Sequence, residues 1–125
     1  MAEERVRSNV VKIKVKAYYC VSVDSVKLKA DKTEVVIGET VHFTVECKLE
    51  KRAEKDVEWV YDIFVNGKKI TNGIIQGYKV KIPKGRSEGS GKFELTFKEV
   101  GDYEVYVEGP NSACEPFEIP FPIVP

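Results

Sequence analysis

The sequence predicts an all-β fold, an antiparallel β-sandwich of roughly seven to nine strands. Over most of the chain apolar and polar residues alternate, as they do in strands that bury one face. No segment repeats its apolar residues at the spacing of a helix. Turn signals separate the alternating runs, and this combination is typical of a sandwich.

The segment 93–107, FELTFKEVGDYEVYV, carries the clearest signal. Phe93, Leu95 and Phe97 share one face of a first strand. Tyr103 opens a second strand directly after a Gly-Asp turn, the position of a tyrosine corner whose ring lies in the core and whose hydroxyl bonds the turn backbone. The predicted core consists of Phe43, Val45, Trp59, Phe93, Leu95, Phe97, Tyr103 and Val105.

The first half of the chain predicts several further strands. Residues 10–23 alternate apart from the irregular stretch 18–20, and they form one long strand or two shorter ones. The pattern continues over 26–30, a turn follows, and 33–37 makes a short strand. Residues 41–49 are the longest clean alternation, which predicts one wall of the core.

The middle of the chain contains the strongest turn signal. Residues 50–56 are polar and predict a loop. In residues 57–65 apolar side chains occur at both odd and even positions, as in a strand that is covered on both faces. The residues of this strand that we place inward are Trp59, Tyr61 and Ile63. Asn66-Gly67 predicts a tight hairpin turn, because both residues accept a positive φ.

After this hairpin the chain returns in residues 68–70, and Asn72-Gly73 allows a further reversal. Residues 78–82 alternate up to Pro83, which ends the ladder because it lacks an N–H donor. Residues 83–91, PKGRSEGSG, combine glycine, serine and charge and predict a mobile loop. Gly89-Ser90-Gly91-Lys92 resembles a phosphate-binding loop, but the spacing of the surrounding residues does not fit one, so we expect no nucleotide site.

The last segment, 114–125, places four prolines between apolar residues. It is an edge strand at best, or an extended tail, and its prolines deter further pairing. The alternative is an apolar peptide that docks onto a partner.

Length and charge limit the classes of function. A chain of 125 residues predicts a single domain, with 1–25 as an N-terminal extension or added strand. Twenty basic and twenty acidic residues give a formal charge of zero, so no global field favours a nucleic acid or an acidic membrane. The 32% of charged residues, rich in Lys and Glu, with one Gln, favours a thermophilic source.

The chain shows no sign of a membrane span or an export signal. No apolar run approaches the ~20 residues that cross a bilayer, and residues 1–9 contain no apolar signal-peptide core. We therefore expect a soluble cytoplasmic protein, or an extracellular or cell-surface one if a leader has been removed.

Metal binding and catalysis are both disfavoured. Cys20, Cys47 and Cys114 lie far apart, and His42 is the single histidine. The cysteines are either buried free thiols or include one disulfide, which leaves a third cysteine unpaired. His42 lies on the outer face of its strand, where a catalytic triad is improbable. We expect no enzyme, no catalytic residue, no cofactor and no metal.

The order of these signals resembles a known family. The segments VKLKADKT (26–33), VIGETVHFTV (36–45), FVNGKKI (64–70) and GDYEVYV (101–107) are similar to the immunoglobulin-like and fibronectin type III-like modules of prokaryotic surface proteins, notably the CARDB adhesion domain. The resemblance covers roughly 26–118 and implies an immunoglobulin-like sandwich that hosts many unrelated roles. Val105 stands where an immunoglobulin core would place its second cysteine.

Three non-enzymatic functions remain. The first is a protein-interaction or assembly module that associates through a sheet edge, using the strand 10–23, the segment 117–124, or both. The second is a carbohydrate-binding module with exposed Tyr18, Tyr78 and Tyr106 as stacking surfaces. The third is a structural component of a cell surface or virus particle. The expected partner is a protein or a second copy of the chain, with no nucleic acid and no membrane insertion.

Overall fold

The computed structural model describes residues 5–14, 19–70 and 78–116, and within these ranges it contains nine β-strands and no helix. The all-β fold predicted from the sequence is therefore confirmed. The strands are β1 (Cys20–Ala30), β2 (Thr40–Leu49), β3 (Val57–Val60), β4 (Asp62–Val65), β5 (Lys68–Lys69), β6 (Lys79–Ile82), β7 (Glu88–Thr96), β8 (Val105–Glu108) and β9 (Ser112–Cys114). Every pairing between them is antiparallel.

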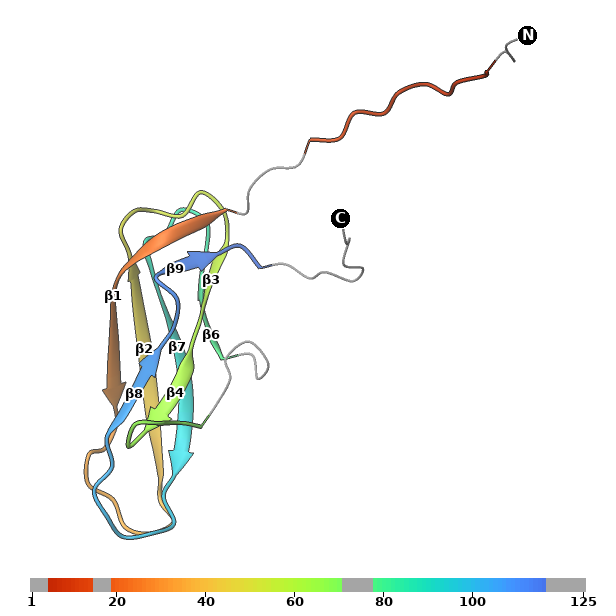
Figure 1. Cartoon of the computed structure of the whole chain (residues 1–125). Helices are drawn as coiled ribbons and strands as arrows, with labels where there is room; N and C mark the ends of the chain where they lie inside the picture. The colour runs from red at the N-terminus through yellow and green to blue at the C-terminus, as the bar shows by residue number, and fades with distance from the viewer. Residues whose placement is uncertain (1–4, 15–18, 71–77, 117–125) are drawn as a thin grey trace.

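The strands form two hydrogen-bonded groups that share one long axis (Figure 1). Six strands follow the order β6-β3-β9-β1-β2-β7, and three follow the order β5-β4-β8. Strands β3 and β4 succeed each other directly, with Tyr61 between them, so they connect the two groups. Strand β1 also makes a transition: residues 20–22 pair with β9, and residues 23–30 pair with β2.

The core lies between the β1-β2-β7 layer and the β3/β4 layer. The alternation of β2 buries every second residue, and Trp59, Tyr61 and Ile63 are each at most 2% exposed. The core comprises Val21, Val41, Phe43, Val45, Cys47, Leu49, Ala53, Val57, Trp59, Tyr61, Ile63, Val80, Ile82, Phe93 and Ala113. Phe43, Val45, Trp59 and Phe93 are thus buried as predicted, while Leu95, Phe97 and Val105 are half-buried and pack against this cluster.

Two glycines explain why a predicted mobile loop is part of a strand. Strand β7 begins at Glu88, inside the Gly/Ser-rich segment, and Gly89 pairs with Cys47 of β2. A Cβ atom on Gly89 would lie 2.5 Å from the carbonyl oxygen of Lys81, and one on Gly91 would lie 3.0 Å from that of Lys79. The glycines therefore permit close packing of β7 against β6.

The upper end of the molecule in Figure 1 is closed by covalent and polar contacts. Cys20 of β1 and Cys114 of β9 form a disulfide, which leaves Cys47 as a buried free thiol. The indole N–H of Trp59 donates a hydrogen bond to the carbonyl oxygen of Pro110 at 2.7 Å. These contacts fix the β8/β9 segment against β1 and β3.

The structure contradicts two strand predictions. Residues 10–14 are not in a strand, and β1 starts at Cys20. Residues 33–37 form a loop in which Val36 and Ile37 are 69% and 59% exposed, because no neighbouring strand covers them. The Glu39 carboxylate holds this loop instead, by accepting a hydrogen bond from the Val36 N–H at 3.2 Å.

The predicted turn at Asn66-Gly67 is confirmed, with φ angles of 52° and 78°. The tyrosine corner is confirmed in its hydrogen bond and wrong in its burial. Tyr103 Oη donates to the carbonyl oxygen of Glu99 at 2.8 Å, yet the residue is 37% exposed. Its ring packs beside Phe97 at the rim of the core, with centroids 4.6 Å apart. Asn72-Gly73 and the segment 117–124 lie outside the described residues.

Candidate functional site

A groove opens at the end of the molecule opposite the disulfide. It has a volume of about 1190 Å³ and lies between the end of β1, the loop after β1 and the segment that leads into β8. Its apolar lining includes Leu28, Val35, Phe97 and Val105, all half-buried, and Val36, which is exposed. Among the described residues, no strand or loop completes the burial of these side chains.

Strand β8 borders this groove and has a free edge. It pairs with β4 and, among the described residues, with no strand on its other side. Ile63 faces Val107 in the β4–β8 register, and its carbonyl oxygen accepts a hydrogen bond from Ile70 on the opposite side at 2.9 Å. Because hydrogen-bonded and non-hydrogen-bonded pairs alternate in an antiparallel ladder, the backbone N–H and C=O of Val105 and Val107 point to the free edge.

The neighbouring pair supports the same register. Asn66 donates its backbone N–H to the carbonyl oxygen of Glu104 at 2.8 Å, and the Glu104 N–H donates to Oδ1 of Asn66. Glu104 thus directs its backbone groups towards β4. Strand β8 offers two outward donors and two outward acceptors to an added strand, two residues apart.

The free edge is acidic. From residue 99 to residue 115 the chain carries Glu99, Asp102, Glu104, Glu108 and Glu115 and no basic residue. Glu104 and Glu108 alternate with the half-buried Val105 and Val107 and are exposed, so they lie on the outer face of β8. The run without lysine or arginine is the signal in the sequence that could have indicated a charged edge.

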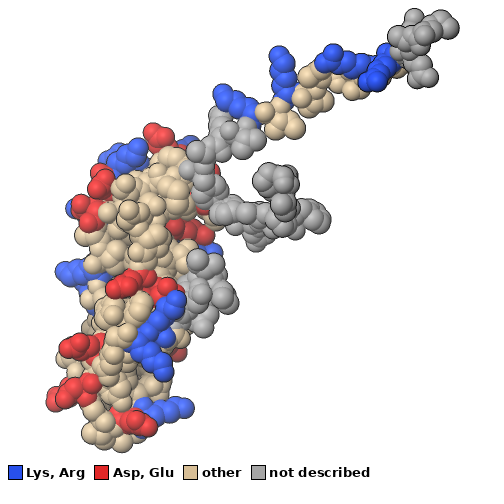
Figure 2. Space-filling view, viewed as in Figure 1, with Lys and Arg blue, Asp and Glu red and all other residues tan. Residues whose placement is uncertain are grey.

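The arm, residues 5–14, extends away from the body (Figure 1). All its residues are exposed, including Val11 at 74% and Ile13 at 83%. Its charged residues are all basic, Arg5, Arg7, Lys12 and Lys14, and they stand out as the blue side chains along the arm in Figure 2. The body shown in the same view carries both signs of charge.

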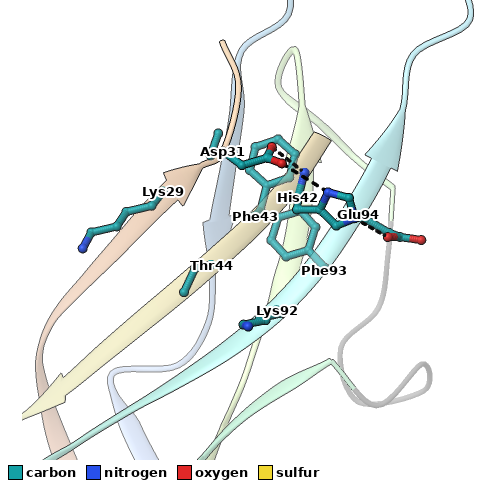
Figure 3. Close-up of a pocket in the computed structure, with 9 residues that line it drawn as sticks. Lys29, Asp31, His42, Phe43, Thr44, Lys92, Phe93 and Glu94 are labelled. Carbon is teal, nitrogen blue, oxygen red and sulfur yellow. Dashed lines mark hydrogen bonds and ion pairs between the residues drawn. The ribbon is translucent and has the colours of Figure 1, made fainter. Parts of the chain in front are cut away.

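His42 forms a polar cluster with Asp31 and Glu94 on the outer face of the β1-β2-β7 layer (Figure 3). Its Nδ1 lies 3.3 Å from Oδ2 of Asp31, and its Nε2 lies 3.1 Å from Oε2 of Glu94. The two carboxylates approach opposite nitrogens of the ring and do not converge on one point that a metal could occupy. Both nitrogens are engaged by carboxylates, so the cluster joins the end of β1 to β2 and β7.

The same cluster anchors the loop after β1. The backbone N–H of His42 donates to Oδ1 of Asp31 at 2.9 Å, and this bond is the main reason why the pKa of Asp31 lies below 3.8. The pKa of Glu39 is likewise held below 4.5, chiefly by the N–H of Val36 and then by Lys32. Both carboxylates stabilise the loop in their ionised form.

The tyrosines proposed for sugar stacking have different surroundings. Tyr106 is 38% exposed, and its ring stacks on Phe64 with centroids 4.9 Å apart. Tyr78 is half-buried and contacts the rings of Tyr61 and Phe93. Tyr18 lies outside the described residues. Of the two tyrosines that the structure describes, Tyr106 is the exposed one, and one face of its ring already lies against Phe64.

The described residues contain neither a candidate metal site nor a helix that could span a membrane. Within residues 5–14, 19–70 and 78–116, no group of three or more His, Cys, Asp or Glu residues is arranged to hold a metal ion. The described part of the chain also has no helix that is long and apolar enough to cross a membrane. Burial raises the pKa of the Cys47 thiol to about 11, so this cysteine stays protonated at neutral pH.

Comparison of the chain with protein families, with curated proteins and with solved structures finds no match in any of the three.

Proposed function

We propose that the protein is an interaction module that binds an extended polypeptide segment on the free edge of β8, beside the apolar groove. The observation that carries this proposal is the free edge itself, where Val105 and Val107 direct backbone donors and acceptors away from β4. An added strand satisfies such groups, and pockets for its alternate side chains give specificity.

The groove explains why addition would be favourable. Each backbone hydrogen bond contributes about 0.5–1.5 kcal/mol net, which is too little for specific binding by itself. Apolar side chains of an added strand would cover Leu28, Phe97 and Val105, which the protein leaves partly exposed. Burial of apolar area supplies the larger share, at roughly 25 cal/mol per Å².

The other sequence-based functions stay predictions. The resemblance to CARDB modules concerns the fold and favours no single role. A non-catalytic role agrees with the engagement of both His42 nitrogens by carboxylates. The carbohydrate alternative is weaker because Tyr106 already has one face against Phe64. A structural role at a surface or in a particle would use the same edge.

The test is a selection of ten-residue peptides from a displayed library against the full chain. Val107→Pro removes an outward N–H without removing a bond to β4, whereas the matched control Val107→Thr keeps that N–H and the branched shape. We expect selected peptides to alternate apolar and basic residues, to bind Val107→Thr, and to lose binding to Val107→Pro. Peptides that bind both variants equally would show that β8 is not the binding edge.

A further inference from the structure

We propose that the segment that β8 accepts is the arm of a second copy of this chain, with residues 10–14 added as a strand along Val105–Glu108. This inference rests on the proposed function and names its partner. The arm and the edge match in backbone shape, in side-chain pattern and in charge, and each match comes from different residues.

The first match is conformational. The arm is extended and lies away from the body, so its backbone donors and acceptors remain available to a partner strand (Figure 1). The one hydrogen bond recorded for its described residues runs within the arm, from Ser8 Oγ to the carbonyl oxygen of Asn9. Residues 5–14 span up to roughly 33 Å when extended, enough to reach a neighbouring molecule.

The second match is the order of apolar and polar side chains. Val11 and Ile13 share one face of an extended arm, and Lys12 and Lys14 share the other. Strand β8 has the same period, with Val105 and Val107 directed inward. A paired arm would therefore place Val11 and Ile13 over the groove.

The third match is electrostatic. The same pairing places Lys12 and Lys14 on the outer face, next to Glu104 and Glu108 of the edge strand. Opposite charges on neighbouring strands stabilise the pair, whereas like charges destabilise it. The described arm has no acidic residue and the segment 99–115 has no basic residue, so the complementarity holds in either strand direction.

A second copy fits better than the chain's own arm. The arm lies beyond the disulfide-closed end of the body and points away from β8 in Figure 1. Val11 and Ile13 are 74% and 83% exposed, and docking onto a second copy would bury them. Reciprocal exchange of two arms would close a dimer, since each chain supplies one arm and one edge.

The experiment reverses charge on each side separately and then mixes the products. One chain carries Lys12→Glu and Lys14→Glu, the other carries Glu104→Lys and Glu108→Lys, and each keeps one surface native. The control matched to the arm reversal, Lys48→Glu with Lys81→Glu, makes the same change of net charge on exposed residues of β2 and β6. Sedimentation equilibrium over a concentration series at low salt measures association, and Trp59 fluorescence checks folding.

We expect the native chain and the control to self-associate. Each reversed chain should self-associate with an affinity at least about tenfold lower. The mixture should associate again, because the acidic arm then meets the basic edge and the basic arm meets the acidic edge. Added salt should weaken the native association.

A native chain that stays monomeric at every concentration would overturn the proposal, as would association that neither reversal changes. Monomeric chains that still bind selected peptides at β8 would overturn only the second copy as partner and leave the proposed function standing. Absence of peptide binding, or peptide binding that Val107→Pro leaves unchanged, would reject both the proposed function and the second copy as partner.

Discussion

The two ends of this molecule differ in how the β8/β9 segment is held against the other strands. At one end the β8/β9 segment is tied to β1 by the Cys20–Cys114 disulfide and to β3 by the bond between Trp59 and Pro110, and the side chains beneath are almost fully buried. At the other end the same segment, now as β8, has no strand on its outer side among the described residues.

The difference shows what each end can do. A closed end with a covalent tie contributes stability and offers few unpaired backbone groups. An open end keeps Phe97, Tyr103 and Val105 only partly covered, and it retains outward backbone groups that another strand can use. The disulfide-closed end and the free edge that we propose for recognition thus lie apart along the length of one sandwich-like core.

Removal of the disulfide should have the largest effect. Cys20 and Cys114 are 94 residues apart, and in the chain-entropy account a loop of this length stabilises the native state by about 4–5 kcal/mol. We expect Cys20→Ser with Cys114→Ser to lose most of that in urea denaturation. A reductant should lower the midpoint of the native protein and leave that of the double variant unchanged; equal midpoints for the native protein with and without reductant would refute the tie.

Two phenylalanines that line the groove compare a buried ring with a half-buried one. Phe43 is 6% exposed and stacks on Phe93 at 4.8 Å, so Phe43→Ala should cost about 3–5 kcal/mol. Phe97 lies half-buried at the groove, and Phe97→Ala should cost roughly half as much because less area is lost. Denaturation midpoints of the two variants measure this, and an equal loss would mean that the groove end is as well packed as the core.

Gly89 tests the approach of β6 to β7. A methyl group there would meet the carbonyl oxygen of Lys81 and the side chain of Ile82, so Gly89→Ala should destabilise by about 1–3 kcal/mol. Gly101→Ala is the control, because its nearest neighbour is the Tyr103 ring at 3.8 Å, an ordinary contact. Similar thermal midpoints for the two variants would return the segment to the mobile loop that its composition predicts.

The smallest of these effects is expected from acid, which should weaken the hydrogen bonds that hold the loop after β1 at the open end. Asp31 and Glu39 have lowered pKa values, so their stabilising bonds are complete above pH 3.8 and 4.5 and are lost as the pH falls through the lower folded-state values. The amide resonances of His42 and Val36 should follow these titrations in NMR. In the Asp31→Asn variant, the change of the His42 amide resonance with acid should disappear. A titration midpoint of Asp31 at or above pH 3.8 in the native protein would contradict its hydrogen bond to the His42 N–H.

Much of the fold was accessible from sequence because alternation reports burial directly. The inward faces of β2 and of the 57–65 segment were predicted correctly, and so was the Asn66-Gly67 turn, whose positive φ values only a few residues accept. The failures have a common origin. Residues 10–14 and 33–37 have strand-like patterns without a partner strand, and alternation does not reveal whether a partner exists.

The candidate site was only partly accessible. The idea of an edge used for assembly came from sequence, and residues 10–14 of the arm belong to the segment 10–23, one of the two segments that it named. The identity of the edge did not, because the groove depends on residues far apart in the chain, such as Leu28 and Val105, and on which side of β8 lies unpaired. The glycines of β7 misled the prediction because composition does not distinguish close packing from flexibility.

The most direct test of the central claim is hydrogen exchange within β8 itself. In the Lys12→Glu, Lys14→Glu chain at high dilution, where arms do not dock, we expect the Val105 and Val107 amides to exchange fast and the Tyr106 amide, which faces β4, to be protected. On association of the native chain, Val105 and Val107 should become protected. Equal protection of all three amides in the dilute variant would contradict a free edge and with it this account.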